Sequence, residues 1–171
     1  MASMIGSKVE RKEDKKFLTG KGRYTADINL HNQTYAVFIR SPHARAKITG
    51  IDTTKAKKAS GVVDVLTGKE LQDDKIGGLI AGWKIVSKDG TDMKCPAHPA
   101  LASDTVNYVG DHVALVIAES LQEAKDAAEL VDVKYKVLKA VASTGQAMDS
   151  ETIHEGIDKN LCFDWELGDK A

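Results

Sequence analysis

The 171-residue sequence has little of several features that define whole classes of protein. Its two cysteines, Cys95 and Cys162, are too few for a disulfide framework and indicate a reducing compartment. No apolar run approaches the roughly 18 residues that a membrane-spanning helix needs. The start, Met1 to Met4, has no apolar signal core, so we expect a cytoplasmic protein.

Charge of one sign is also scarce. The net charge is -1, and no block of five like charges occurs, so the sequence offers neither a nucleic-acid footprint nor a polybasic membrane patch. Hydrophobic residues make up 42% and charged residues 29%, which is typical of a soluble globular chain. This length allows one domain with a sizeable core, or two small ones.

Several short segments have the composition of β-strands. Tyr24–Ile28 and Gln33–Ile39 carry β-branched and aromatic residues around a short polar connection, which predicts two strands joined by a tight turn. The second segment is apolar on both faces, so we expect a central strand. Lys47–Ile51 and Val62–Leu66 predict two further strands.

Three helix starts are marked by capping residues. Asp52 begins a short predicted helix, which Gly61 ends in the left-handed conformation. Thr67 and Glu70 form a capping box before a second short helix. Ser120 and Glu123 form another, before a helix with an apolar stripe of Leu121, Ala124, Ala127, Ala128 and Val131.

The strongest strand signals flank that last helix. Val113–Ala118 is apolar throughout, which predicts a strand buried on both faces, and Val131–Val137 alternates, which predicts a strand with one wet face. Strand, helix and strand in this order indicate a βαβ unit, right-handed if the strands are parallel. Residues 72–104 lack periodicity and predict a surface excursion, with Trp83–Val86 as a strand candidate.

Candidate chemical groups are few and isolated. Cys95 and His98 have a C-x-x-H spacing, but a zinc site needs about four ligands, and no second pair follows. A nucleophilic cysteine needs a rigid paired histidine, which a proline-bracketed loop provides poorly. His112 and His154 stand alone. His43, after Pro42, is a candidate general base, but a residue that bonds a turn or packs at an interface is the favoured interpretation.

The glycine and aspartate motifs favour turns over catalysis. Gly20-x-Gly22 precedes a predicted strand, whereas a dinucleotide fingerprint follows one. Gly77–Gly78 reads as a flexible turn. Gly110 indicates a turn or bulge, in which Asp111 caps or accepts amides. We therefore assign no catalytic, cofactor-binding or metal-binding residue to this chain.

Four sequence blocks, in a fixed order and spacing, nevertheless indicate a particular protein family. They are Phe17–Asp27; Phe38–Ile51, with Arg40-Ser41-Pro42-His43-Ala44; His98–Ala102 with Tyr108-Val109-Gly110-Asp111; and Val113–Tyr135. Together they resemble the N-terminal domain of the large, molybdopterin-binding subunit of the molybdenum hydroxylases. That family includes xanthine dehydrogenase, aldehyde oxidase and aerobic carbon monoxide dehydrogenase. The Tyr108–Asp111 form resembles the carbon monoxide dehydrogenase-like members.

The resemblance implies an α+β fold, the α/β-hammerhead, with a mixed sheet and two or three packed helices. It divides the chain into an extended arm (1–22), the hammerhead domain (23–141) and a tail (142–171) leading to a cofactor domain that is absent. Molybdopterin would belong to that absent domain, and 2Fe-2S clusters and FAD to partner subunits or domains of the parent oxidoreductase. One departure is Lys139, where the family often has proline, which puts the following turn in doubt.

Three functions follow as hypotheses. The first is a structural and assembly domain of a molybdenum hydroxylase, inactive by itself. The second is a stand-alone protein-interaction module with this fold. The third is a small hydrolase built on His43 or His112. The late apolar patch Leu161, Phe163 and Trp165 has nothing after it to complete a core, and with part of the 72–104 excursion around Trp83 it predicts a surface that a neighbouring domain covers. We therefore expect a disordered tail after about Asp158 or self-association through this patch; the alternative is that Trp165 folds back into the domain's own core.

Overall fold

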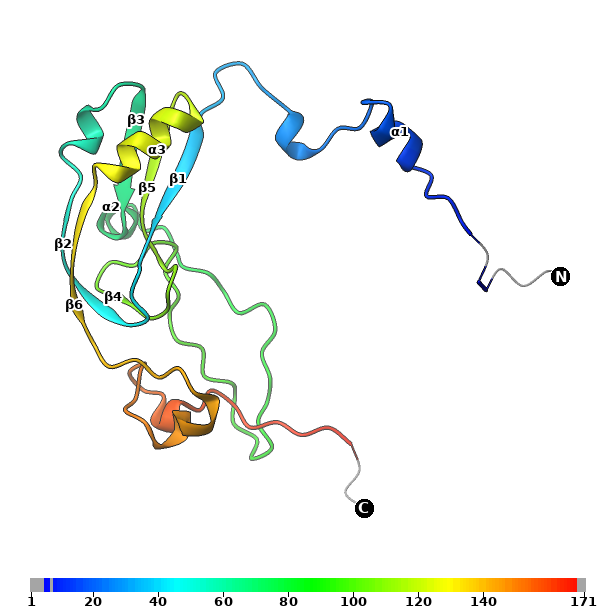
Figure 1. Cartoon of the computed structure of the whole chain (residues 1–171). Helices are drawn as coiled ribbons and strands as arrows, with labels where there is room; N and C mark the ends of the chain where they lie inside the picture. The colour runs from blue at the N-terminus through cyan, green and yellow to red at the C-terminus, as the bar shows by residue number, and fades with distance from the viewer. Residues whose placement is uncertain (1–4, 7, 169–171) are drawn as a thin grey trace. The chain divides into compact units, whose positions relative to one another are not determined.

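The computed structural model describes residues 5, 6 and 8–168, so Met1 to Met4, which carry the signal-peptide argument, lie outside the described residues. The chain divides into two units, the first ending at Gln33 and the second beginning at Thr34. The first contains α1 (Asp14–Leu18) and a 3₁₀ turn, η1 (Thr25–Asp27) (Figure 1).

The first unit owes its local structure to one aromatic stack. Phe17 and Tyr24 stack with ring centroids 5.0 Å apart, and a Cβ at Gly22 would overlap the Phe17 ring. The Tyr24 backbone N–H donates to the Asp27 carboxylate at 2.8 Å, which starts η1. The predicted strand Tyr24–Ile28 is therefore wrong, because Asp27 caps a turn. The arm that we expect to be extended also contains α1.

Over residues 34–168, the second unit contains six strands in two antiparallel sheets (Figure 1). One sheet has the order β1–β5–β3 and the other the order β4–β2–β6. The strands are β1 (Tyr35–Arg40), β2 (Ala46–Asp52), β3 (Val62–Thr67), β4 (Thr105–Val106), β5 (His112–Ala118) and β6 (Asp132–Val137). The helical elements are η2 (Ala56–Lys58), α2 (Gly68–Asp73), α3 (Leu121–Glu129), η3 (Thr144–Asp149) and η4 (Asp158–Asn160).

The buried strand of the first sheet is β5, as its apolar sequence predicts. Val113, Ala114 and Val116 are fully buried, and β5 pairs on one side with β1 and on the other with β3. The prediction that β1 is central is wrong, because β1 is an edge strand. Its alternation is as predicted, but Phe38 on the second face is 42% exposed.

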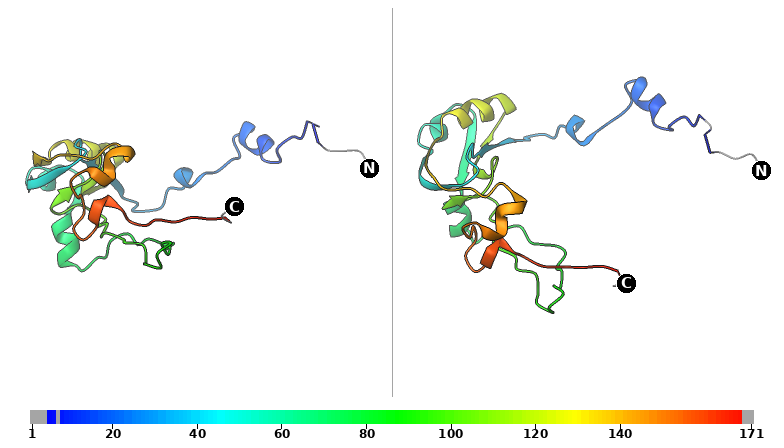
Figure 2. Two further views of the ribbon diagram at one scale, coloured as in Figure 1. Left: turned by 90° about the horizontal axis from the view of Figure 1, so that it is seen from below. Right: turned by 60° about the horizontal axis from the view of Figure 1, so that its bottom comes forward.

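Helix α3 packs on this first sheet through small side chains. Ala124 and Ala127 are fully buried, and Ala127 belongs to a cluster with Val65 and Val116. Figures 1 and 2 show α3 lying over the sheet. Leu121, predicted on the buried stripe, is 45% exposed because it is the first residue after the cap, where the helix enters from solvent.

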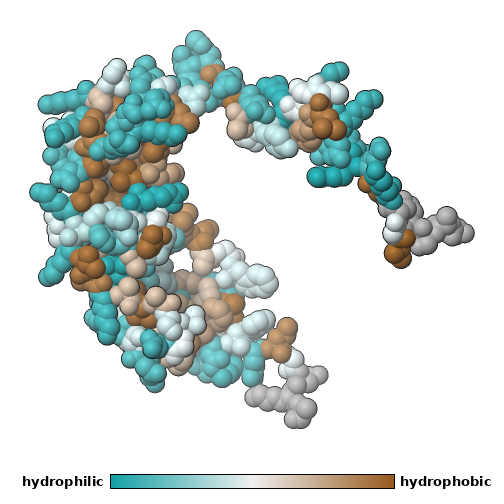
Figure 3. Space-filling model, in the orientation of Figure 1, coloured by the Kyte–Doolittle hydropathy of each residue, from teal (hydrophilic) through white to brown (hydrophobic). Residues whose placement is uncertain are grey.

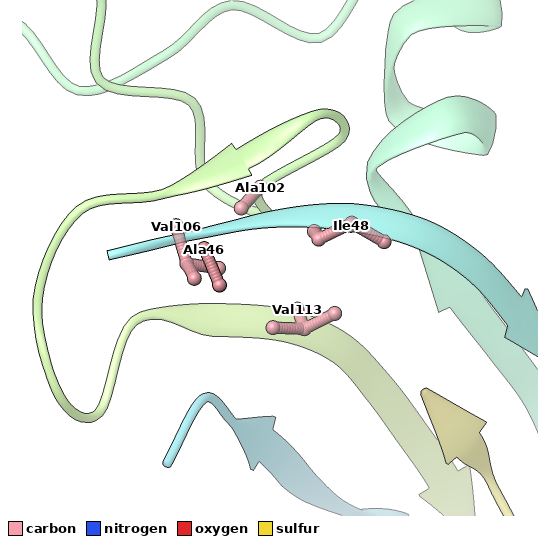
Figure 4. Close-up of a cluster of buried hydrophobic side chains, with 5 residues drawn as sticks. All are labelled: Ala46, Ile48, Ala102, Val106 and Val113. Carbon is pink, nitrogen blue, oxygen red and sulfur yellow. The ribbon is translucent and has the colours of Figure 1, made fainter. Parts of the chain in front are cut away.

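The connection through α3 differs from a βαβ unit. It carries the chain from β5 in one sheet to β6 in the other, where β6 pairs antiparallel with β2. A second buried cluster joins these parts: Ala46 and Ile48 of β2 contact Ala102, Val106 and Val113 (Figure 4). Because Val113 lies on β5 and Val106 on β4, this cluster ties the two sheets together.

The predicted capping box of α2 is confirmed, and at α3 the Ser120 cap is present, with the Glu123 carboxylate accepting from the Ser120 hydroxyl instead of from the backbone N–H of a capping box. Thr67 and Glu70 form the capping box of α2, and the Ser120 hydroxyl oxygen accepts the Glu123 N–H at 3.2 Å at the start of α3. Gly61 has φ of +71°, in the left-handed region, but the helix before it is only the 3₁₀ turn η2. Trp83–Val86 forms no strand; Val86 makes a single bridge to Asp92.

Candidate docking surface

Two irregular segments that are far apart in the sequence lie side by side. α2 includes residues 72 and 73 of the predicted excursion, and β6 ends at Val137, before the predicted start of the tail at 142. We therefore call residues 74–104 the excursion and residues 138–168 the tail. The Lys94 N–H donates to the Cys162 carbonyl oxygen at 2.9 Å, and the Lys88 N–H donates to the Asp164 carbonyl oxygen at 2.8 Å. Figures 1 and 2 show the red end of the tail running beside the green excursion. The tail is therefore joined to the excursion as far as Asp164.

A charged contact reinforces this junction. The Lys88 ammonium lies 2.5 Å from the Asp164 carboxylate, and the Asp164 N–H donates to the Ser87 hydroxyl at 3.3 Å. The hydrogen bond to Asp164, followed by the charge of its carboxylate, raises the pKa of Lys88. Both side chains are about half exposed, so water screens the pair, and we expect it to contribute little to stability.

The base of the tail is folded around Asn160. Its side-chain amide donates to the carbonyl oxygens of Ala147 and Glu151 at 2.9 and 3.1 Å, and its oxygen accepts the Ile153 N–H at 2.8 Å. Ile157, nearby in sequence, is only 5% exposed. The expected disorder after Asp158 is thus wrong for this stretch, because η4 and the bonds of Asn160 hold it.

Arg45 connects the tail to the sheets. It lies immediately before β2, and its guanidinium donates to the Lys139 carbonyl oxygen at 3.2 Å and to the Ile153 carbonyl oxygen at 3.3 Å. The Leu138 N–H in turn donates to the Arg45 carbonyl oxygen at 3.0 Å. One side chain therefore holds both ends of the first tail segment.

The excursion and tail together carry a group of exposed apolar side chains, which we call the docking surface. The most exposed are Ile80 (90%), Leu167 (87%) and Trp83 (84%). Leu79, Phe163 and Trp165 complete the group, and Trp165 is 55% exposed rather than buried in the domain's own core. A hollow of about 590 Å³ is lined by residues of both segments, including Leu79, Ile80 and Phe163 of this group. Figure 3 shows hydrophobic side chains interspersed with polar ones over this part of the molecule.

Four of the polar residues singled out in the sequence meet at a second, smaller hollow of about 210 Å³. His98, Tyr108, Asp111 and His154 line it. The Tyr108 hydroxyl lies 3.4 Å from His98 Nε2. Burial, with the nearby Asp111 charge second, raises the pKa of Tyr108. Asp111 accepts the Asn107 N–H at 3.0 Å, which confirms its predicted role in the turn at Gly110.

The two histidines of the hydrolase hypothesis have packing contacts. His43 meets the Tyr135 ring edge-on at 5.0 Å, and its backbone N–H donates to the Ser41 hydroxyl at 3.0 Å. His112 stacks on Phe38 at 4.3 Å. These contacts match the turn and packing roles favoured for His43.

Metal and cofactor ligands do not converge in the described part of the chain. Among residues 5, 6 and 8–168, no three His, Cys, Asp or Glu side chains form a group that could hold a metal ion. An iron–sulfur cluster needs four ligands, usually cysteines, and this chain has two. The residues present therefore do not fit such a centre. No helix in the described ranges is long and apolar enough to cross a membrane.

Sequence reasoning missed the residues that organise the tail. Asn160 carried one available signal, because asparagine tolerates the left-handed conformation that it adopts with φ of 55°. Arg45 and Lys88 carried none, since their partners are 108 and 76 residues away.

Known proteins share this architecture. Residues 19–139 match the family described as "Aldehyde oxidase and xanthine dehydrogenase, a/b hammerhead domain". The chain is 38% identical to the nicotine 6-hydroxylase large subunit of Paenarthrobacter nicotinovorans, over 90% of this chain and 18% of that protein. It is 35% identical to the carbon monoxide dehydrogenase large chain of Afipia carboxidovorans, over 97% of this chain and 21% of that one.

A solved structure agrees with these sequence matches. Quinoline 2-oxidoreductase from Pseudomonas putida 86 superposes with a TM-score of 0.75 at 35% identity, covering 86% of this chain and 18% of that one. The chain thus spans about a fifth of the length of these relatives. The predicted α+β hammerhead fold is confirmed, and the chain belongs to the aldehyde oxidase and xanthine dehydrogenase family as its α/β-hammerhead domain.

Proposed function

We propose that this chain is a non-catalytic assembly domain of a cytoplasmic, molybdopterin-dependent oxidoreductase. The docking surface carries the proposal. Contiguous exposed apolar side chains on a folded domain mark a surface that another protein part covers. Ile80, Trp83 and Leu167 are each more than 80% exposed, which is costly for large apolar groups that have no covering partner.

The occupant that fits this surface is the remainder of a large subunit. The relatives continue for about four times the length that this chain matches, so most of their chain is available to cover it. We take residues 1–22 as an arm, 23–141 as the hammerhead domain and 142–171 as the segment leading to the cofactor domain. The Arg45 and Asn160 bonds would then fix the direction in which the tail leaves the sheets.

Cofactors and other partners follow from the same proposal. Molybdopterin would lie in the remainder of the large subunit, and 2Fe-2S clusters and FAD in partner subunits or domains. This division accords with the two cysteines of the chain and with the packing roles of His43 and His112. The substrate would be chosen by the cofactor domain.

The second candidate is a stand-alone interaction module with the same fold. The same exposed apolar group favours it, because that surface fits a separate protein partner as well as a covalently joined one. The two candidates differ in whether the covering part belongs to the same polypeptide.

The assay of the purified chain tests the absence of catalysis. Aldehydes and N-heteroaromatic compounds with an artificial electron acceptor should show no turnover, and acyl and phosphoryl esters should show no hydrolysis. Turnover that is lost in a His43→Ala or His112→Ala variant would contradict the proposal and favour the hydrolase.

The docking surface is tested by tryptophan fluorescence of the Trp83→Phe variant, in which Trp165 should emit as a solvent-exposed indole.

A further inference from the structure

The two cysteines of the chain lie in one place. Cys95 belongs to the excursion and Cys162 to the tail, 67 residues apart in the sequence, and both line the 590 Å³ hollow of the docking surface. Both are free thiols; Cys95 is exposed and Cys162 is partly exposed. Sequence reasoning treated them as unrelated, because nothing in the sequence places the tail on the excursion.

Backbone bonds hold the two residues next to each other. The Lys94 N–H donates to the carbonyl oxygen of Cys162 itself, so the residue preceding Cys95 is hydrogen-bonded to Cys162. Backbones joined in this way run about 5 Å apart, which describes the separation of Lys94 and Cys162. Cys95 is the next residue along the excursion and lines the same hollow as Cys162, and a disulfide needs Cα atoms about 4.4–6.8 Å apart.

The surroundings keep this approach fixed on both sides. On the excursion, the Met93 N–H, two residues before Cys95, donates to the Ile85 carbonyl oxygen at 2.9 Å. On the tail, Asp164 is held by Lys88 and Ser87. The Cys95 thiol donates weakly to the Met93 carbonyl oxygen at 3.6 Å, a contact that a change of side-chain rotamer would break.

We infer that Cys95 and Cys162 form a reversible disulfide that locks the tail onto the excursion. The oxidant is a low-molecular-weight disulfide such as oxidised glutathione. The thiolate of the more exposed Cys95 attacks one sulfur of this reagent, forming a mixed disulfide and releasing one small thiol. The thiolate of Cys162 then attacks the Cys95 sulfur and releases the second small thiol. Two protein thiols lose two electrons, and one small disulfide becomes two thiols.

This inference does not depend on the proposed function. An assembly domain and a stand-alone module would both carry the cysteine pair, because it rests on the junction between tail and excursion. Its effect is to fix the orientation of Phe163, which follows Cys162 and lines the same hollow. In a reducing compartment such a bond is transient and reports redox state.

The test measures the effective concentration of the two thiols in the purified chain. The chain is equilibrated with graded ratios of oxidised to reduced glutathione, once in buffer and once in concentrated urea. Each sample is then quenched with acid and alkylated, and its mass is measured by intact mass spectrometry. The native chain should gain the Cys95–Cys162 bond at an effective concentration at least about tenfold above that in urea, because folding holds the thiols together. Peptide mapping without reductant locates the bond.

Equal values in buffer and urea would overturn the inference, as would two separate glutathione adducts or linked dimers as the main native products. A matched control relocates one thiol within the same segment: Cys95→Ser combined with Thr91→Cys puts it at an exposed position outside the hollow. In that variant, the effective concentration of the two thiols in buffer should no longer be tenfold above that in urea. Retention of the advantage would mean that flexible segments, and not the hollow, bring the thiols together.

Discussion

The Arg45 guanidinium donates to the Ile153 carbonyl oxygen at 3.3 Å, across 108 residues of sequence. With its second bond, to Lys139, this contact turns the predicted free tail into a part of the domain. The tail then carries Phe163 and Trp165 to the excursion. The docking surface thus depends on several long-range contacts, of which those of Arg45, beside β2, hold the base of the tail.

Replacing Arg45 with Ala should release the base of the tail. Two hydrogen bonds from a charged donor are lost and the two carbonyl acceptors are left without it, so we expect a loss of about 1–3 kcal/mol in unfolding free energy. Hydrogen exchange of residues 144–160 should accelerate. Arg40→Ala is the matched control, because Arg40 also donates to a carbonyl oxygen, that of Gly110, but does not touch the tail. Unchanged exchange in Arg45→Ala would contradict this role.

Asn160 should tolerate neither loss of its amide hydrogens nor a change of backbone conformation. Asn160→Asp keeps the acceptor for Ile153 but loses the donors to Ala147 and Glu151, and we expect a cost of about 1–3 kcal/mol. Asn32→Asp is the control, since Asn32 shares the left-handed conformation with φ of 58°. Urea melts of both variants measure the difference; equal midpoints would show that the amide bonds are dispensable.

The contact between α3 and the first sheet sets a limit on side-chain size. Ala127 is fully buried against Val65 and Val116, so Ala127→Leu should overpack this contact and cost about 1–3 kcal/mol. Lys125→Leu places the same side chain on the exposed face of the helix and should leave the urea midpoint nearly unchanged. If both variants have the same urea midpoint, Ala127 does not lie on the buried face of α3.

The cap of α3 gives a smaller and separable effect. The Ser120 hydroxyl oxygen accepts the Glu123 N–H, so Ser120→Ala should cost about 0.5–2 kcal/mol. Ser120→Asp restores an acceptor and should recover most of the loss. A Ser120→Ala variant as stable as the wild type would show that water replaces the cap.

Acid should weaken the capping box of α2. The hydrogen bond from the Thr67 hydroxyl, the largest cause, lowers the pKa of Glu70 below 4.5 in the folded chain. A lowered folded pKa contributes stability that is present above the unfolded pKa and is lost as the pH falls through the folded pKa. Thr67→Val should therefore reduce the loss of stability on acidification below about pH 4.5. Urea melts at several acidic pH values measure how the unfolding free energy depends on pH. If that dependence is the same in Thr67→Val as in the wild type, the hydrogen bond from Thr67 is not what lowers the pKa of Glu70.

Local rules predicted the parts of the fold in which neighbours in sequence are neighbours in space. The capping box at Thr67 and the cap at Ser120 involve contacts three residues apart, and the apolar run of β5 demands burial by itself. The edge position of β1 and the crossing of α3 between sheets depend on strand pairing, which period-2 alternation does not specify. The docking surface was only half predicted. Its apolar side chains were visible, but the bonds of Arg45, Lys88 and Asn160 that assemble it are long-range or need a folded tail.

The central claim is that the domain assembles an enzyme and takes no part in its chemistry. A chimera tests it most directly, with this chain replacing the matching segment of the carbon monoxide dehydrogenase large chain of Afipia carboxidovorans. The turnover number for carbon monoxide oxidation is measured per mole of assembled, fully cofactor-loaded enzyme. We predict a value within about threefold of the parent, a difference below 1 kcal/mol in the activation barrier. A fully loaded, assembled chimera that is slower by about a hundredfold or more would contradict the account, because residues of this domain would then act in the chemical step.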